Sequence, residues 1–513
     1  MTSEPSTPAA PEASPGDHQV EEVEHRQRPR SEAFKRFIAS GWQPWRDGVP
    51  ARAAGAETAA RHRDQLSVRF PGERLVLPAG TLRVRSNDTD YRFRPHSAFA
   101  HLTGLGTDQE PDAVLVLEPR GGEDGAPAGH DAVLFFRPRA DRDTEEFYAD
   151  ARYGELWVGV RPSCAEIAAL TGLDVRHLDE LADAIRKDVG EGGVTVRVMR
   201  GADASVEEAL EQARGLDVGD GPGADAELAR AVSELRLVKD AYEIEQMRLA
   251  VAATARGFED IVRALEEAVR SPRGERVVET AFEGRARREG NGVGYDTIAA
   301  AGAHACTLHW IRNDGEVHEG DLVLVDAGVE VDSLYTADVT RTLPVSGRFS
   351  PAQRRVYEAV LEAADAAFEV ARPGRTFREL HEAAMRVVAT RLCEWGLLPD
   401  GVGVEEALAE QGQYHRRWMV HGTSHHLGID VHDCAQARRE MYLDGVLEPG
   451  MVFTIEPGLY FRSDDLLVPE ELRGIGVRIE DDVVVTRDGC ENLSAMVPRR
   501  PDDVESWMAR LRG

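Results

Sequence analysis

Two pairs of acidic residues inside apolar, strand-forming segments constrain the fold of this chain more than any other feature. Asp326 follows the apolar run 322–325, and the β-prone segment that returns along the chain carries Asp338. If the two segments form an antiparallel hairpin, the midpoint of the two aspartates places its turn at Asp332. Directly opposed side chains lie about 4.5–5.5 Å apart at Cβ, so two carboxylates there repel each other. The sequence therefore predicts a cation between them.

A second acidic pair, Glu456 and Glu480, repeats this pattern. Glu456 ends the apolar run 452–455, and Glu480 follows the β-prone segment 477–479. Their midpoint falls in the polar loop 462–473, so these two carboxylates can also face each other across a hairpin. One such acid is usually a strand end or a salt-bridge partner, but two pairs are hard to explain structurally because unpaired buried charge is costly. Four carboxylates can hold two hard divalent cations, such as Mn²⁺, about 3.5–4 Å apart.

Nitrogen ligands for such a site lie in the segment 421–433, between the two acidic pairs. Four of the 16 histidines of the chain occur there: His421, His425, His426 and His432. Histidine is the commonest metal ligand in proteins. Each of these residues, taken singly, has a structural explanation, and we expect His426 to be a bystander. The density of histidines nevertheless predicts that at least one of the four binds metal.

Length and composition limit the class of protein. A chain of 513 residues is too long to fold around a single hydrophobic core, so its length predicts two or three domains. The 91 acidic and 61 basic residues give a net charge of -30, which argues against nucleic acid or an anionic membrane as partner. The five cysteines form no CxxC pair, no secretory signal pattern is found, and no run of about 18 apolar residues occurs. We expect a cytoplasmic protein.

Three regions are predicted along the chain. Residues 1–32 are rich in Pro, Ala, Ser, Thr and Glu and predict a disordered tail. Residues 33–225 alternate between strand-like and helix-like segments, which favours an α/β N-terminal domain. Its expected strands are 75–77, 113–117, 132–136 and 194–198. Its histidines His96 and His101 are expected to be structural, because no second ligand lies at a useful spacing.

The C-terminal domain, residues 226–513, is predicted to be α+β. Asp240 and Glu243 have the spacing of a capping box and should start its first helix. The expected helices are 241–270, 274–289 and 351–392. The expected strands, which form hairpins, are 322–331, 335–344, 451–461 and 475–486.

The order of these residues and their flanking motifs resembles the aminopeptidase P family of proline-specific metallopeptidases. The acids and the histidine lie in Val-Asp-Ala-Gly, Asp-Val-Thr-Arg-Thr-Leu-Pro, His-Gly-Thr-Ser-His, Thr-Ile-Glu-Pro-Gly-Leu-Tyr and Val-Arg-Ile-Glu-Asp. The match covers about residues 235–495, and the first domain resembles the family more loosely through 100–104 and 111–116. The resemblance implies a C-terminal pita-bread domain with pseudo-twofold halves, which holds two divalent metal ions, expected to be Mn²⁺.

The resemblance also implies a role for each matching residue. Asp326 should bind one ion, His425 and Glu456 the other, and Asp338 and Glu480 both. The residues that match those surrounding the ligands in the family are His309, His421, His432, Tyr460 and Arg478.

The implied reaction is release of the N-terminal residue from peptides with proline in second position. A hydroxide bridging the two ions would attack the scissile carbonyl, His309 or His432 would stabilise the oxyanion, and Glu456 would move the proton. The alternatives are an Xaa-Pro dipeptidase (prolidase), a methionine aminopeptidase, which leaves the first domain unexplained, and a catalytically inert pita-bread binding module. The last is disfavoured because all five ligand positions are competent. The family further implies a homodimer or homotetramer.

Two departures from the family pattern are visible. The interval between Asp326 and Asp338 is one residue longer than usual, which suggests an altered turn or a bulge near Asp332. His96-Ser97-Ala98 stands where some bacterial members carry Asn-Ser-Asp. We therefore expect the turn and this segment to differ from the family.

Overall fold

The structure is a computed structural model of the chain, and it describes residue 29 and residues 31–45, 48–107, 111–121, 127–190, 193–215 and 221–513. The predicted tail 1–32 therefore lies outside the described residues, apart from Pro29, Ser31 and Glu32. The chain forms two compact units, Met1–Asp47 with Pro138–Pro162, and Gly48–Arg137 with Ser163–Gly513. The domain boundaries at residues 32 and 225 stay predictions.

The described residues of the smaller unit form three short helices, α1 (Glu32–Ile38), α4 (Glu145–Ala149) and α5 (Glu155–Val158). Phe147 and Tyr148 form its apolar centre, against which Phe34 and Trp45 pack. The buried guanidinium of Arg161 pairs with two glutamates of the helices, so charge as well as apolar contact holds this small unit together.

The larger unit begins with a mixed five-stranded sheet in the order β6-β5-β4-β1-β7. Its strands are β1 (Arg74–Pro78), β4 (Val114–Gly121), β5 (Pro127–Phe136), β6 (Asp174–His177) and β7 (Val196–Val198). Successive side chains of β1 point to opposite faces of the sheet, where two different apolar clusters lie. Leu75 and Leu77 belong to one of these clusters and Val76 to the other. The predicted α/β pattern is confirmed here.

Helices cover this sheet, and a small hairpin projects from it. The helices are α2 (Ala56–Arg69), α3 (Ser97–Thr103), α6 (Cys164–Thr171), α7 (Leu181–Arg186), α8 (Ala204–Arg214) and α9 (Gly221–Leu235). The hairpin consists of β2 (Val84–Ser86) and β3 (Thr89–Asp90). His96 accepts a hydrogen bond from the Ala98 N–H and so caps α3, in agreement with the structural role expected for it.

The first half of the remaining chain places a pair of helices against a three-stranded sheet. Its elements are α10 (Ala241–Arg270), α11 (Gly274–Glu289), β8 (Gly292–Val293), β9 (Ile298–Ala301), β10 (Leu322–Ala327), β11 (Val329–Glu330) and β12 (Val339–Pro344). Both predicted helices are confirmed with the expected bounds. The capping box of Asp240 and Glu243 is also confirmed.

The second half repeats this arrangement of a helix pair and hairpins. Its elements are α12 (Pro351–Val370), α13 (Phe377–Glu394), α14 (Val404–Leu408), α15 (Arg439–Tyr442), β13 (Val452–Ile455), β14 (Gly458–Phe461), β15 (Ile475–Arg478), β16 (Asp481–Val485), β17 (Cys490–Asn492) and α16 (Pro501–Arg512). The prediction of one helix over 351–392 is wrong, because Pro373 lacks an N–H and Gly374 has a φ of +86°.

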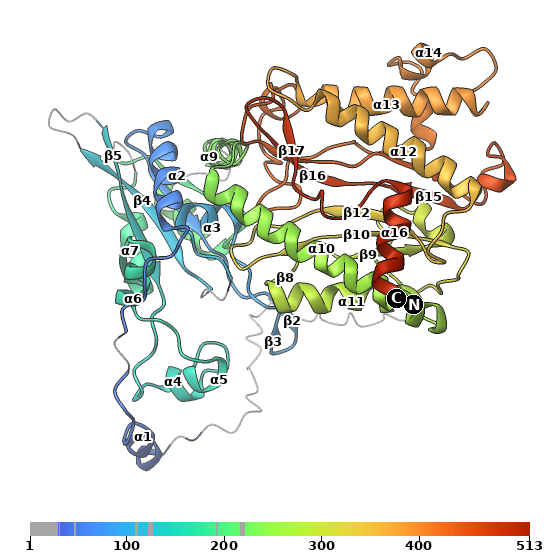
Figure 1. Cartoon of the computed structure of the whole chain (residues 1–513). Helices are drawn as coiled ribbons and strands as arrows, with labels where there is room; N and C mark the ends of the chain where they lie inside the picture. The colour runs from blue at the N-terminus through green and yellow to red at the C-terminus, as the bar shows by residue number, and fades with distance from the viewer. Residues whose placement is uncertain are drawn as a thin grey trace, which may run out of the picture. The chain divides into compact units, whose positions relative to one another are not determined.

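The sheets of the two halves lie between the helix pair α10–α11 and the helix pair α12–α13 (Figure 1). One large apolar cluster contains residues of both halves, including Phe258, Val325, Val360 and Phe453. The acidic hairpins are therefore the central layer of the domain. This position makes their carboxylates buried and close to one another.

Candidate metal centre and active-site cleft

The first acidic hairpin has a different register from the predicted one. Asp326 of β10 pairs with Thr340 of β12, and the same register continues to the bridge between Glu330 and Thr336. Asp338 therefore opposes Gly328, not Asp326, and the prediction that the two aspartates are directly opposed is wrong. Both still project from the same face, because Asp338 and Thr340 are two residues apart.

The cause of this register is a three-residue turn, 332–334, centred on Ser333. The Leu334 N–H donates to the carbonyl of Val331, and the Val331 N–H donates to the carbonyl of Tyr335. Leu334 has a φ of +72°, the left-handed conformation that closes three-residue hairpin loops. The expected change near Asp332 is therefore a shifted turn, and the strands between Asp326 and Asp338 pair without a bulge.

The second acidic hairpin has the predicted register. Ile455 pairs with Asp481 on one side, and Gly458 pairs with Arg478 on the other. Glu456 and Glu480 thus oppose each other at the junction of the two ladders. Both side chains are largely buried, with exposed fractions of 16% and 2%.

His425 brings a ring nitrogen to the carboxylates of both hairpins. Its Nε2 lies 3.2 Å from Asp338 Oδ2, 3.7 Å from Glu456 Oε1 and 4.0 Å from Glu480 Oε1. The donor atoms of Asp338, His425 and Glu480 all lie within 4.8 Å of one another, which suits ligands of a shared ion. His426, in contrast, points into an aromatic cluster and stacks on Phe377, as expected for a bystander.

The electrostatics of the cluster fit bound cations. Burial and the neighbouring carboxylates raise the pKa of Asp338 and raise that of Glu480 well above its usual value. Burial raises the pKa of Glu456 to about 7. Burial disfavours the His425 imidazolium, but the hydrogen bond to Asp338 and the charge of Glu456 outweigh it and raise the pKa of His425 to about 9. A buried set of oxygen donors with one imidazole is the ligand chemistry of hard divalent ions.

Three of the five predicted residues around the ligands, Arg478, Tyr460 and His421, form a hydrogen-bonded chain on the Asp326 side. Arg478 Nη2 donates to Asp326 Oδ2 at 2.5 Å, and its Nη1 donates to the Tyr460 hydroxyl at 3.1 Å. That hydroxyl donates to His421 Nε2 at 2.7 Å, because His421 Nδ1–H is used by the carbonyl of Gly422. Burial and the charge of Arg478 lower the pKa of His421 to about 3, so this histidine is a neutral acceptor.

One cleft of about 470 Å³ exposes these groups. Its walls contain all five predicted ligands and four of the predicted surrounding residues: Asp326, Asp338, His425, Glu456 and Glu480, with His309, His421, His432 and Arg478. Tyr460 reaches the cleft through its contacts with His421 and Arg478. The cleft is open enough for a peptide and supplies carboxylates, imidazoles and a guanidinium to it.

Sequence reasoning missed two residues at the carboxylates. The Tyr295 hydroxyl contacts an oxygen of Asp326 at 2.7 Å and an oxygen of Asp338, and it can donate its one proton to only one of them. Asp482 accepts the Asp338 N–H at 3.1 Å. The only signal for Tyr295 was its place just before β9, the strand that pairs with the Asp326 strand.

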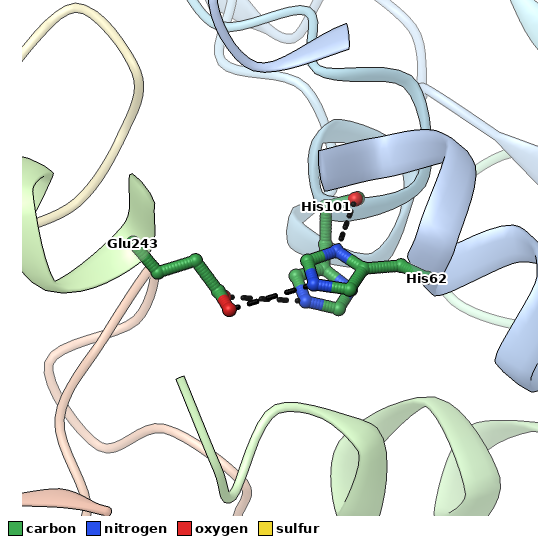
Figure 2. Close-up of side chains that lie close together, drawn as sticks. All are labelled: His62, His101 and Glu243. Carbon is green, nitrogen blue, oxygen red and sulfur yellow. Dashed lines mark hydrogen bonds and ion pairs between the residues drawn. The ribbon is translucent and has the colours of Figure 1, made fainter. Parts of the chain in front are cut away.

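A second cluster of possible ligands lies elsewhere in the larger unit, where His62 of α2, His101 of α3 and Glu243 of α10 meet (Figure 2). The Nε2 atom of each histidine lies 3.4 Å from one carboxylate oxygen of Glu243. The rings are stacked at 3.8 Å and almost parallel, at 10°. A histidine nitrogen binds a metal ion that lies in the plane of its ring. The planes of two stacked, parallel rings do not meet, so a single ion cannot lie in the planes of both rings. This geometry favours the structural role expected for His101.

Glu243 is instead the buried acceptor of a polar network. It lies beside the two histidine rings, and it accepts the Tyr335 hydroxyl at 2.7 Å and the Asp240 N–H at 2.8 Å. His62 Nδ1 donates to the carbonyl of His101. The contacts with His101 and His62 overcome the effect of burial and hold the pKa of Glu243 well below its usual value. The network therefore links α2, α3, α10 and the turn of the first acidic hairpin.

Comparisons with known proteins agree with this site. Residues 245–487 match the model of metallopeptidase family M24, and residues 59–196 match the model of the aminopeptidase P N-terminal domain. The chain is 52% identical to Xaa-Pro aminopeptidase 1 of Streptomyces coelicolor over 94% of its own length and 93% of that protein. The structure of Pseudomonas aeruginosa aminopeptidase PepP superposes with a TM-score of 0.74 at 34% identity, covering 90% of this chain and all of that one.

A zinc-substituted Escherichia coli aminopeptidase P in complex with product gives a TM-score of 0.73 at 32% identity, over 90% of this chain and all of that chain. The similarity thus extends over both the N-terminal and the metal-binding parts, which confirms the predicted pita-bread architecture. With its buried carboxylates and histidine, the chain belongs to the aminopeptidase P family of M24 metallopeptidases, which are metal-dependent hydrolases.

Proposed function

We propose that this protein removes the N-terminal residue from peptides that have proline in second position. The observation that carries the proposal is the convergence of Asp326, Asp338, His425, Glu456 and Glu480 on one cleft in a chain that matches aminopeptidase P over both domains. The curated relatives are named Xaa-Pro aminopeptidases, which does not favour the dipeptidase alternative.

The five ligands are proposed to hold two divalent ions, with Mn²⁺ as the native metal. Asp326 would bind one ion, His425 and Glu456 the other, and Asp338 and Glu480 both. The support is the raised pKa values of Asp338, Glu456 and Glu480, because carboxylates that resist ionisation in a buried cluster gain most from a bound cation. When bound, such ions supply Lewis-acid chemistry, which polarises a carbonyl and acidifies water.

The side chains of the cleft are proposed to bind and orient the peptide. His309 and His432 line the cleft beside the ligands and would donate hydrogen bonds to the reacting carbonyl. Glu456 would carry the proton to the proline nitrogen, because its carboxylate lines the cleft next to the other ligands and within reach of a bound peptide. Arg478, Tyr460 and His421 would hold Asp326 and the proline end of the cleft in place.

A peptide series tests the proposal. The Mn²⁺-loaded protein is incubated with Ala-Pro, Ala-Pro-Ala and Ala-Ala-Ala, and released alanine is measured. We expect cleavage of both proline peptides and not of Ala-Ala-Ala. Cleavage confined to Ala-Pro would establish the dipeptidase, and no cleavage by metal-loaded protein would favour the inert binding module.

Assembly and location are also proposals. We propose a homodimer or homotetramer, which light scattering of the purified protein would test, and a cytoplasmic location. None of the described helices is long and apolar enough to cross a membrane.

A further inference from the structure

A second cleft adjoins the metal-binding cleft. It has a volume of about 540 Å³, and His432 lines both clefts. Its walls come from the segments around the β2–β3 hairpin, from the start of α3, from α9 and from residues 430–436. The segment His96–Ala98, in which this chain departs from some family members, lies in this wall. Because His432 lines both, the two clefts are neighbours.

Two of the four arginines that line this cleft are already neutralised. Arg94 donates to Glu330 at 2.7 Å, and Arg236 donates to Asp433 at 2.8 Å. Asp430, the carboxylate of the cleft wall, lies 3.7 Å from Arg94 and 3.5 Å from Arg236. These pairs fix the shape of the wall and leave little net charge there.

The other two arginines, Arg83 and Arg92, form no ion pair with any residue in the part of the chain that the structure describes. Arg92 uses one N–H on the carbonyl of Asn291, and both side chains are exposed. Tyr91 and Phe93 stand next to them in the same wall, and the Tyr91 N–H donates to the Arg83 carbonyl at 2.9 Å. In a chain with a net charge of -30, two exposed guanidinium groups that form no ion pair with a described residue and line a cleft favour an anionic ligand there.

We propose that this cleft is a subsite for a carboxylate group of the peptide substrate, with Arg83 and Arg92 as specificity-determining residues. The inference rests on the proposed peptidase function, and carboxylates are the anions that peptides carry. Guanidinium groups bind carboxylates through two parallel hydrogen bonds. The carboxylate belongs either to the first residue of the peptide or to a residue after proline, and both present the same chemistry to the cleft.

The test compares matched glutamate and glutamine peptides. We measure kcat/KM for Glu-Pro-Ala-Ala amide against Gln-Pro-Ala-Ala amide, and for Ala-Pro-Glu-Ala amide against Ala-Pro-Gln-Ala amide. Solvent-exposed ion pairs contribute little each, so the expected advantage of glutamate is about three- to tenfold at one of the two positions. The position that shows it identifies the source of the carboxylate. About 0.5 M NaCl should reduce the advantage, because exposed charges are screened.

Variants assign the effect to the cleft. The double variant Arg83→Gln/Arg92→Gln is expected to cleave the glutamate and glutamine peptides of each pair with equal kcat/KM, so that the preference for glutamate is lost. Arg85→Gln is the matched control, because Arg85 lies in β2, two residues after Arg83, and is exposed but does not line the cleft. The subsite is refuted if wild type does not discriminate at either position, if the double variant keeps the preference, or if Arg85→Gln abolishes it. Failure of the peptidase function itself would appear differently, as no cleavage of any of the four peptides.

Discussion

Replacing Gly328 by alanine tests whether the first acidic hairpin fixes the metal site. An added Cβ at Gly328 would lie 1.7 Å from the carbonyl oxygen of Ala337 and 3.1 Å from the Tyr295 ring. Real Cβ atoms do not approach other atoms closer than 3.0 Å, so the strands must separate by about 1 Å or more. The separation breaks the hydrogen bond from the Ala337 N–H to the Val329 carbonyl and moves the adjacent Asp338.

The expected loss of stability follows from these two effects. Forcing an extra carbon into a packed site costs about 1–3 kcal/mol, and the lost backbone hydrogen bond adds about 1 kcal/mol. We therefore expect the free energy of unfolding of Gly328→Ala to fall by about 2–4 kcal/mol. Since Asp338 is proposed to bind both ions, bound metal and peptidase activity should fall together.

Denaturant unfolding and elemental metal analysis measure the two effects on the same samples. Gly284→Ala is the control, because Gly284 lies in the exposed interior of α11 with nothing within 4 Å of its added Cβ. Alanine is favoured over glycine there by about 0.5–1 kcal/mol, so this variant should be slightly more stable. Wild-type metal content and an unchanged unfolding midpoint for Gly328→Ala would refute the reasoning.

Three further predictions concern single groups. Asp338→Ala is expected to abolish metal binding and peptide cleavage, and cleavage by protein that elemental analysis finds free of metal would contradict the assignment. Arg341→Ala should lower the free energy of unfolding by about 3–5 kcal/mol, because the buried Asp481 loses its 2.6 Å ion pair and keeps, of its cationic partners, only Arg499 at 3.8 Å, and the carbonyls of Glu480 and Val497 lose their donor. Arg348→Ala, at an 86% exposed side chain, should change it by less than about 0.5 kcal/mol. Burial lowers the pKa of His101 in the folded protein to about 4, whereas an unfolded histidine has a pKa of about 6.5. Between these two pH values the unfolded chain binds a proton at His101 and the folded protein does not, so the free energy of unfolding should fall as the pH drops from about 6.5 to 4. In His101→Phe that part of the pH dependence, up to about 3 kcal/mol, should vanish in unfolding curves measured across this range, and an unchanged profile would contradict the neutral buried histidine.

The sequence predicted the second acidic hairpin better than the first. The two strand pairs on either side of Glu456 and Glu480 share one register. The midpoint between the two glutamates in the sequence therefore located the hairpin loop correctly. The first turn closes through Leu334 in a left-handed conformation, which leucine rarely adopts. No Gly or Asn marks that position, so the midpoint rule placed the turn one residue too early. Alternation along the strands still kept both aspartates on one face.

Contacts between distant segments were outside the reach of pattern reasoning. Asp326, Tyr460 and Arg478 were selected from their motifs, but their hydrogen bonds depend on how two hairpins pack across the centre of the domain. Tyr295 joins the same site from the segment just before β9, and neither periodicity nor spacing identifies it. The helix boundary at Pro373 was visible in the sequence, but the periodic pattern on both sides concealed it.

The Glu243 network has a consequence for the evolution of this chain. One carboxylate accepts the Tyr335 hydroxyl and lies 3.4 Å from a ring nitrogen of both His62 and His101, and these residues belong to segments far apart in the sequence. A change at one position leaves the others with an unmatched buried group, which costs about 1–3 kcal/mol or more. The four positions should therefore covary among relatives: where an apolar residue replaces Glu243, apolar or aromatic residues should replace both histidines, and the tyrosine should lose its hydroxyl.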